Sequence, residues 1–223
     1  PDCGSATPAV PTTEVTLHVN LDPSAPIALT PFDPASPQAT AAFWTSAPMI
    51  DSLGERRAYE SGQNRAMMVY FVHTGPWTLD WFVQIDGGEM DWGTAGTPVG
   101  LTSGSLVFTT DGLLNQEIHN VGPPWSVQFD GATIQNVHLD FGDSLTTDGG
   151  DGLGSTSVAG PSALLDVTQN GSPASLPCGG DGCGGACWGC GDCESCVDGG
   201  CVPNTDGLDA EGETCDVVCL GDY

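Results

Sequence analysis

The 223-residue sequence contains no lysine and only three arginines, Arg56, Arg57 and Arg65, against 29 acidic residues. A net charge of −26 at pH 7 repels nucleic acid and anionic membranes, because both bind proteins through clustered lysine and arginine. The missing lysine also excludes amide cross-links, which need an ε-amine. Any covalent reinforcement of this chain must therefore come from cysteine.

Long apolar runs are missing as well. No stretch reaches the roughly 18 apolar residues of a membrane-spanning helix, so we expect no membrane insertion. The sequence opens with Pro1 and keeps no hydrophobic signal region, which is the pattern expected of a processed, secreted product. The strong acidity then has two interpretations, solubility outside the cell or Ca²⁺ collected between chains.

Cysteine is absent between Cys3 and Cys178 and dense beyond that point. An even number of clustered cysteines indicates a disulfide framework, which persists only in oxidising compartments. Zinc and an iron–sulfur cluster are alternatives for the C-x2-C spacings, and a secreted chain favours disulfides. We predict that all ten cysteines form disulfides, namely Cys3, Cys178, Cys183, Cys187, Cys190, Cys193, Cys196, Cys201, Cys215 and Cys219.

This distribution divides the chain into three predicted segments. Residues 1–13, rich in proline, threonine and alanine, form an extended arm, and residues 14–176 are long enough to bury one hydrophobic core. Residues 177–223 are too few to fold stably without covalent cross-links, so we expect a small, loop-rich domain stabilised by disulfides there. Cys3 pairs either with this tail in the same chain or with the tail of a neighbouring subunit.

Apolar periodicity in the body indicates strands. Val15, Leu17, Val19 and Leu21 alternate with polar residues, the pattern of a half-buried strand. Further strands are expected at 41–50, at an edge because of Pro48, in a hairpin over 67–72 and 77–85, and at 105–109, 126–129, 133–141 and 164–167. No segment has a helical stripe longer than two turns. We therefore predict an all-β protein, a β-sandwich or an open barrel.

The same alternation predicts which side chains face the core and which face solvent. In the 133–141 strand the inward residues are predicted to be Ile134, Val137, Leu139 and Phe141. His18 and His138 alternate out of their strands and are expected to face solvent.

Catalytic and metal-binding motifs are not found. The four histidines are scattered, and neither G-x-S-x-G, H-E-x-x-H nor a P-loop occurs, so we do not expect an enzyme. No cofactor is predicted. Ca²⁺ stays open for the acidic loops 148–151 and 206–211, although neither has the EF-hand spacing.

Six segments occur in an order that resembles the β-rich middle domain of bacterial flagellar hook proteins. They are VTLHVNLDPSAP (15–26), FDPASP (32–37), IDSLG (50–54), VYFVHTGPWTLDWFVQIDGG (69–88), GSLVFTTDGLL (104–114) and VTQNGSPAS (167–175). The resemblance implies a non-enzymatic building block of a tubular polymer outside the cell. Hook subunits are also framed by long terminal helices and lack a cysteine-rich tail. We therefore expect a hook-like domain used in another cell-surface appendage.

Self-association is the partner expectation that follows. The arm, or the strand candidates Val15, Leu17, Val19 and Leu21, would add to a sheet edge of the next subunit, with Cys3 available for a disulfide between subunits. Such a head-to-tail contact does not close and generates a filament. The alternative function is a monomeric cell-surface adhesion module whose cysteine-rich tail recognises a partner.

Overall fold

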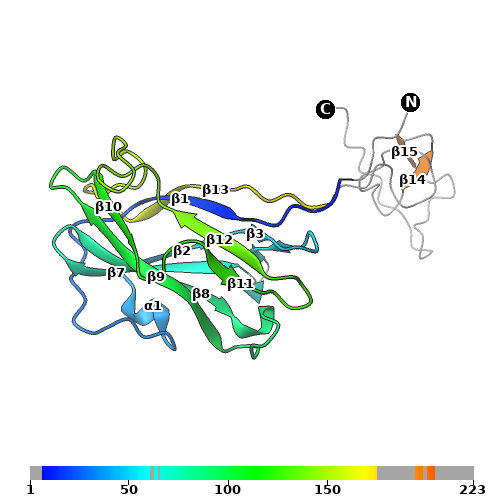
Figure 1. Ribbon diagram of the computed structural model, residues 1–223, viewed down its shortest axis with the longest axis horizontal. Helices are drawn as coiled ribbons and strands as arrows, with labels where there is room; N and C mark the ends of the chain where they lie inside the picture. The colour runs from blue at the N-terminus through cyan, green and yellow to red at the C-terminus, as the bar shows by residue number, and fades with distance from the viewer. Residues whose placement is uncertain (1–6, 61–62, 65, 175–193, 198–199, 204–223) are drawn as a thin grey trace. The chain divides into compact units, whose positions relative to one another are not determined.

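The computed structural model describes residues 7–60, 63–64, 66–174, 194–197 and 200–203. The chain divides into two compact units, Ala9–Pro173 and the remainder formed by Pro1–Pro8 with Ala174–Tyr223 (Figure 1). The β-domain predicted over 14–176 corresponds closely to the first unit.

The cysteine-rich unit is described only as one antiparallel hairpin. Its strands are β14 (Glu194–Val197) and β15 (Gly200–Pro203), with Cys196 and Cys201 at opposite positions of the backbone register. The other eight predicted disulfide positions, including Cys3, lie outside the described residues.

Five antiparallel strands form the larger sheet of the β-domain, in the order β10-β9-β8-β7-β2. The predicted hairpin is confirmed as β7 (Met67–Gly75) and β8 (Thr78–Asp86). Next to β8 lies β9 (Pro98–Phe108), which begins seven residues before the predicted strand at 105–109. Its neighbour β10 (Leu114–His119) was not predicted.

Pro48 divides the strand predicted at 41–50. The first part is β2 (Phe43–Ala47), which lies at a sheet edge as expected for a segment that Pro48 interrupts. The second part, β3 (Met49–Ile50), pairs with β4 (Arg56–Arg57) in a small hairpin, and β5 (Tyr59–Glu60) pairs with β6 (Gln63–Asn64). Regular helix is limited to α1 (Pro37–Thr40) and the 3₁₀ turn η1 (Gly87–Glu89), and no helix in the described residues could cross a membrane.

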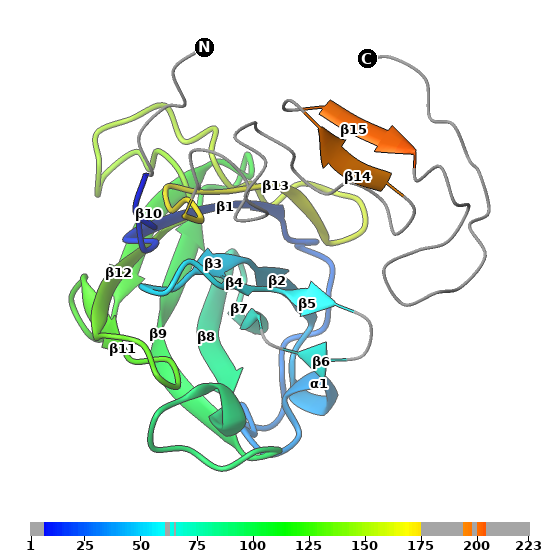
Figure 2. The ribbon, with the colours of Figure 1, turned by 90° about the vertical axis from the view of Figure 1, so that its right-hand side faces the viewer.

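The smaller sheet has four strands in the order β11-β12-β1-β13. At its centre is β1 (Glu14–Asn20), which runs parallel to β12 (Gln135–Asp140) and antiparallel to β13 (Ala163–Gln169). The short β11 (Trp125–Val127) closes the other edge. Figure 2 shows β1 and β13 side by side in this layer, with β8 and β9 in the other.

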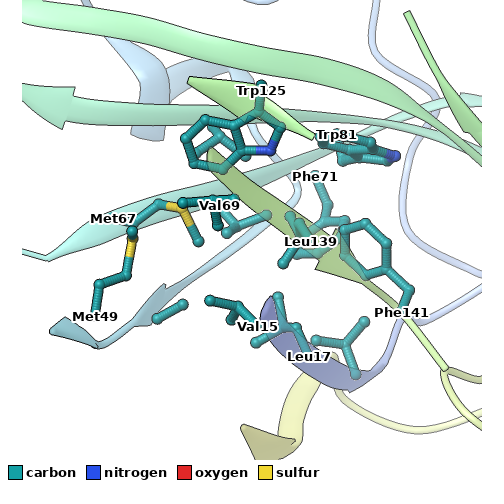
Figure 3. Close-up of a cluster of buried hydrophobic side chains, with 14 of the residues drawn as sticks. Val15, Leu17, Met49, Met67, Val69, Phe71, Trp81, Trp125, Leu139 and Phe141 are labelled. Carbon is teal, nitrogen blue, oxygen red and sulfur yellow. The ribbon is translucent and has the colours of Figure 1, made fainter. Parts of the chain in front are cut away.

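The hydrophobic core lies between the two sheets, so the fold is a β-sandwich. Val15 and Leu17 of β1 pack with Phe71 of β7 and Trp81 of β8, all fully buried (Figure 3). The aromatic rings meet edge to face or tilted, with the centroids of Phe71 and Phe141 5.8 Å apart. This burial is the main stabilisation of the domain.

One predicted core position is wrong. Val137, Leu139 and Phe141 are fully buried as expected, but Ile134 is 65% exposed because β12 begins only at Gln135. Gln135 is buried instead, and its Nε2 donates to the carbonyl oxygen of Thr12 at 3.0 Å. His18 and His138, predicted to face solvent, are half-buried.

Candidate assembly surface

The described part of the arm is held by its own domain. Val10 and Ser172 exchange two backbone hydrogen bonds of 2.9 Å, and the backbone N–H of Thr12 donates to Ile50 at 2.9 Å. The Thr12 hydroxyl is fully buried, where it donates to Gln169 Oε1 and accepts from Ile50 N at 2.8 Å. Of the extended arm predicted over 1–13, residues 10–13 therefore bond to the arm's own domain, and residues 1–6 lie outside the described residues.

The strand that follows has no free edge. β1 pairs with β12 on one side and with β13 on the other, and Val15, Leu17, Val19 and Leu21 are all 0% exposed in the core. A strand paired on both sides has no unsatisfied backbone groups to offer a neighbour. The folded domain therefore does not support these four residues as an assembly surface.

Each sheet has two edge strands, β10 and β2 in the larger sheet and β11 and β13 in the smaller. β10 bonds further to Leu145 and Thr146, and β11 has only three residues, so β2 and β13 are the longer edges. Each of these two carries partly exposed large apolar side chains, Trp44 on β2 and Leu164 and Leu165 on β13. Natural edge strands are commonly protected by lysine, which this chain lacks.

A groove of about 710 Å³ lies where β1 ends and β2 and β13 begin. Asp22 stands in its wall beside Trp44, which is 41% exposed. Oδ1 of Asp22 accepts hydrogen bonds from the hydroxyl and the backbone N–H of Ser24, at 2.7 and 2.8 Å. These bonds lower the pKa of the Asp22 carboxyl, so it is ionised at neutral pH. The full lining is Asp22, Ser24, Ala25, Pro26, Ala42, Phe43, Trp44 and Ser162.

A comparison with protein families identifies the sandwich. The family described as the flagellar basal body protein FlaE D2 domain matches residues 20–172. The chain belongs to this family. The match begins at the last residue of β1 and ends beyond β13, so it includes every strand of the larger sheet and β11, β12 and β13 of the smaller. It confirms the resemblance to the hook-type middle domain. No curated protein matches the chain.

Membership fixes the broad functional class. Flagellar hook domains are structural parts of an extracellular appendage, so the hook-type domain belongs to a structural family and not to an enzyme family. Within the described residues no three histidine, cysteine, aspartate or glutamate side chains gather as a metal site. In the loop at 148–151, considered above for Ca²⁺, Asp148 Oδ2 accepts from the Ser144 hydroxyl at 2.8 Å. The other acidic loop, at 206–211, lies outside the described residues.

A buried ion pair fixes one end of the hook-type domain. The Arg57 side chain donates through Nε and an Nη to Asp51 Oδ2, at 3.0 and 2.6 Å, and through the other Nη to Glu89 Oε2 at 2.8 Å. Its guanidinium carbon lies 5.2 Å from the centre of the Phe129 ring. Arg57 thus ties the β3–β4 hairpin to η1, although the sequence showed it only as one of three clustered arginines.

A second polar tie joins the two sheets. Glu117 of β10 is buried, and its two carboxylate oxygens reach different partners, His119 Nε2 at 2.7 Å and the backbone N–H of Phe141 at 3.1 Å. The His119 ring in turn packs edge-on against Trp81. No sequence pattern predicted the Glu117–His119 pair. Glu117 lies in a strand that was not predicted, and from the sequence it would be taken for a solvent-facing carboxylate.

The stability of the hook-type domain is expected to fall as the pH drops below about 6.5, because of His73. This side chain is 2% exposed, neither ring nitrogen has a hydrogen-bond partner, and burial lowers its pKa while the Asp22 charge partly opposes that shift. As the pH falls through the ordinary histidine pKa of about 6.5, the unfolded chain takes up the proton first, so unfolding becomes more favourable.

His73→Gln tests this linkage. Thermal unfolding midpoints of the wild type and the variant, each measured at about pH 7.5 and about pH 5, should show a smaller drop in the variant. Equal drops in the two proteins would assign the acid sensitivity to other groups.

Proposed function

We propose that the chain is a structural subunit of a secreted extracellular filament or appendage, in which copies associate head to tail. The observation that carries this proposal is the family match across residues 20–172, which includes all of the sandwich strands except β1. The edge strands β2 and β13 support it, because each presents large apolar side chains at the surface.

The pairing of β1 inside the domain limits how copies can associate. Addition of β1 to a neighbour would require breaking its pairing with β12 and β13 and exposing a core strand. Contacts through the surface of the folded sandwich avoid that cost. A head-to-tail contact joins two different surface regions, so successive copies extend into a filament and do not close into a dimer.

Concentration-dependent sedimentation tests the proposal. Purified full chain should shift from monomer to a broad distribution of larger species as its concentration rises. A single monomeric boundary at every concentration would favour the alternative, a monomeric cell-surface binding module, for which the groove with the exposed Trp44 ring is the specific supporting feature.

Disulfides are the covalent part of the proposal. Eight of the nine tail cysteines pair with one another to stabilise the tail domain, and Cys3 links to the ninth in the tail of a neighbouring subunit. Electrophoresis without reductant should show a ladder of multimers that collapses when reductant is added and is missing in Cys3→Ser. A single monomer band for the wild type would confine every bridge to one chain.

A further inference from the structure

The hairpin of the cysteine-rich unit brings two cysteines to one place in the backbone. Its strands β14 and β15 run antiparallel, and Figure 2 shows them side by side. Four consecutive residue pairs oppose one another without a register shift, and Cys196 with Cys201 is one of these pairs. These are also the two cysteines that fall within the described residues, so the register singles out one pairing among the many that ten cysteines allow.

The local sequence favours the same register. Only Asp198 and Gly199 stand between the two strands, and Asp-Gly is a sequence that two-residue hairpin connections prefer. Val197 and Val202 are β-branched residues with high strand propensity. A slip of one residue would take Cys201 away from the position opposite Cys196, and the short connection opposes such a slip because loop length fixes the register of a hairpin.

The spacing of opposed positions suits a disulfide. In an antiparallel pair, opposed Cα atoms are about 4.5 Å or about 5.5 Å apart, depending on whether the pair is hydrogen-bonded. Cysteines joined by a disulfide have Cα atoms about 4.4 to 6.8 Å apart. Both spacings of the strand pair fall inside that range, so a bridge at this position needs no change of the backbone. A structural zinc site would instead need two further ligands at the same place.

We propose that Cys196 and Cys201 form a disulfide across the β14–β15 hairpin. The two thiols give up two protons and two electrons as one S–S bond forms, and a disulfide-carrying thiol oxidoreductase accepts them and is reduced to its dithiol. The bridge closes over four intervening residues, so the entropic cost of bringing its ends together is small. The inference rests on the proposed disulfide framework and not on the proposed self-association.

This bridge narrows the choice of partner for Cys3. Cys196 and Cys201 are then used within one chain and are not free to join a neighbouring subunit. The proposed link from Cys3 must go to another cysteine of the tail. The candidates are Cys178, Cys183, Cys187, Cys190, Cys193, Cys215 and Cys219.

Peptide mapping of the full chain, secreted through an oxidising compartment, tests the bridge. Free thiols are blocked with an alkylating agent under denaturing conditions without reductant, and a protease then cleaves after glutamate. Cleavage after Glu194 and Glu211 releases residues 195–211, in which Cys196 and Cys201 are the only cysteines. We expect this peptide to be free of other peptides and lighter than its reduced form by two hydrogen atoms. Cleavage before Asp198 should then give two pieces that stay joined until reductant is added.

Cysteine variants give a second measurement, the number of thiols that an alkylating agent labels in the denatured chain. Cys201→Ser should add one labelled thiol, on Cys196, and Cys196→Ser should add one on Cys201. The double variant should add none, because it removes a complete bridge. Ser195→Ala, in the same strand, is the matched control and should leave both the peptide map and the thiol count unchanged. The wild-type map stands without these variants, should one of them fail to fold.

The possible results separate the pairing from the wider proposal. Residues 195–211 linked to any other cysteine peptide overturn the Cys196–Cys201 pairing and leave the disulfide framework intact. Two alkylated thiols on residues 195–211 overturn the pairing and also the prediction that all ten cysteines form disulfides. Label on a different cysteine in Cys201→Ser overturns the pairing as well. None of these results depends on whether copies associate, which sedimentation measures separately.

Discussion

Arg57→Met is expected to lower the free energy of unfolding by about 3–5 kcal/mol, because it leaves the Asp51 carboxylate buried without its cation. Asp51 is 0% exposed, and its Oδ2 accepts two of the Arg57 donors. Its Oδ1 accepts from the N–H groups of Leu53 and Glu55, both at 2.9 Å, so the side chain cannot turn away to water without opening that turn. Urea denaturation followed by circular dichroism measures the effect.

A double variant distinguishes loss of the charge pair from loss of packing. Asp51→Asn with Arg57→Met removes both buried charges and keeps an oxygen for the Leu53 and Glu55 N–H groups. Replacing both members of a buried pair is usually much less costly than removing one. The double variant should therefore be more stable than Arg57→Met. If the two variants are equally stable, the loss comes mainly from the packing of the long Arg57 side chain on Phe129.

Trp81→Ala is expected to cost about 3–5 kcal/mol, the usual penalty for removing a large buried aromatic side chain. Trp81 is fully buried at the centre of the larger sheet, between the Phe141 ring, 5.3 Å away, and the His119 ring, 5.1 Å away. The cavity would open at the place where the two sheets meet, so thermal unfolding of the domain should shift strongly to lower temperature.

Trp44→Ala is the matched control. The same substitution at this edge position, 41% exposed on β2, should cost about 1 kcal/mol or less, and its main effect should be on association. Similar losses of stability for both variants would contradict the division of tryptophans between core and surface.

The sequence predicted the elements whose pattern repeats locally. Alternation from Val15 to Leu21 located β1, and the run from Met67 onward located the central hairpin, because each strand has one consistently apolar face. The sequence did not predict β10, because Leu114 and Ile118 are its only large apolar residues. Its Glu117, which is buried, has the residue type of a solvent-facing position. Ile134 was misplaced because Gln135, not an apolar residue, occupies the first inward position of β12.

The assembly surface was less predictable than the fold. Edge position depends on which strands become neighbours. Pro48 indicated the edge position of β2, but nothing in the alternation showed that β1 is central and that β13 lies at an edge. The anchoring of the arm depends on partners far along the chain, such as Ile50 and Gln169 for Thr12. Likewise, Asp22, Trp44 and Ser162 form one groove only after both sheets are in place.

Negative-stain electron microscopy of the purified full chain shows whether copies of this chain polymerise. We expect filaments of uniform width that lengthen as the protein concentration rises. Monodisperse single particles at high concentration, from protein whose circular dichroism shows the folded β-domain, would mean that the chain is not a filament subunit.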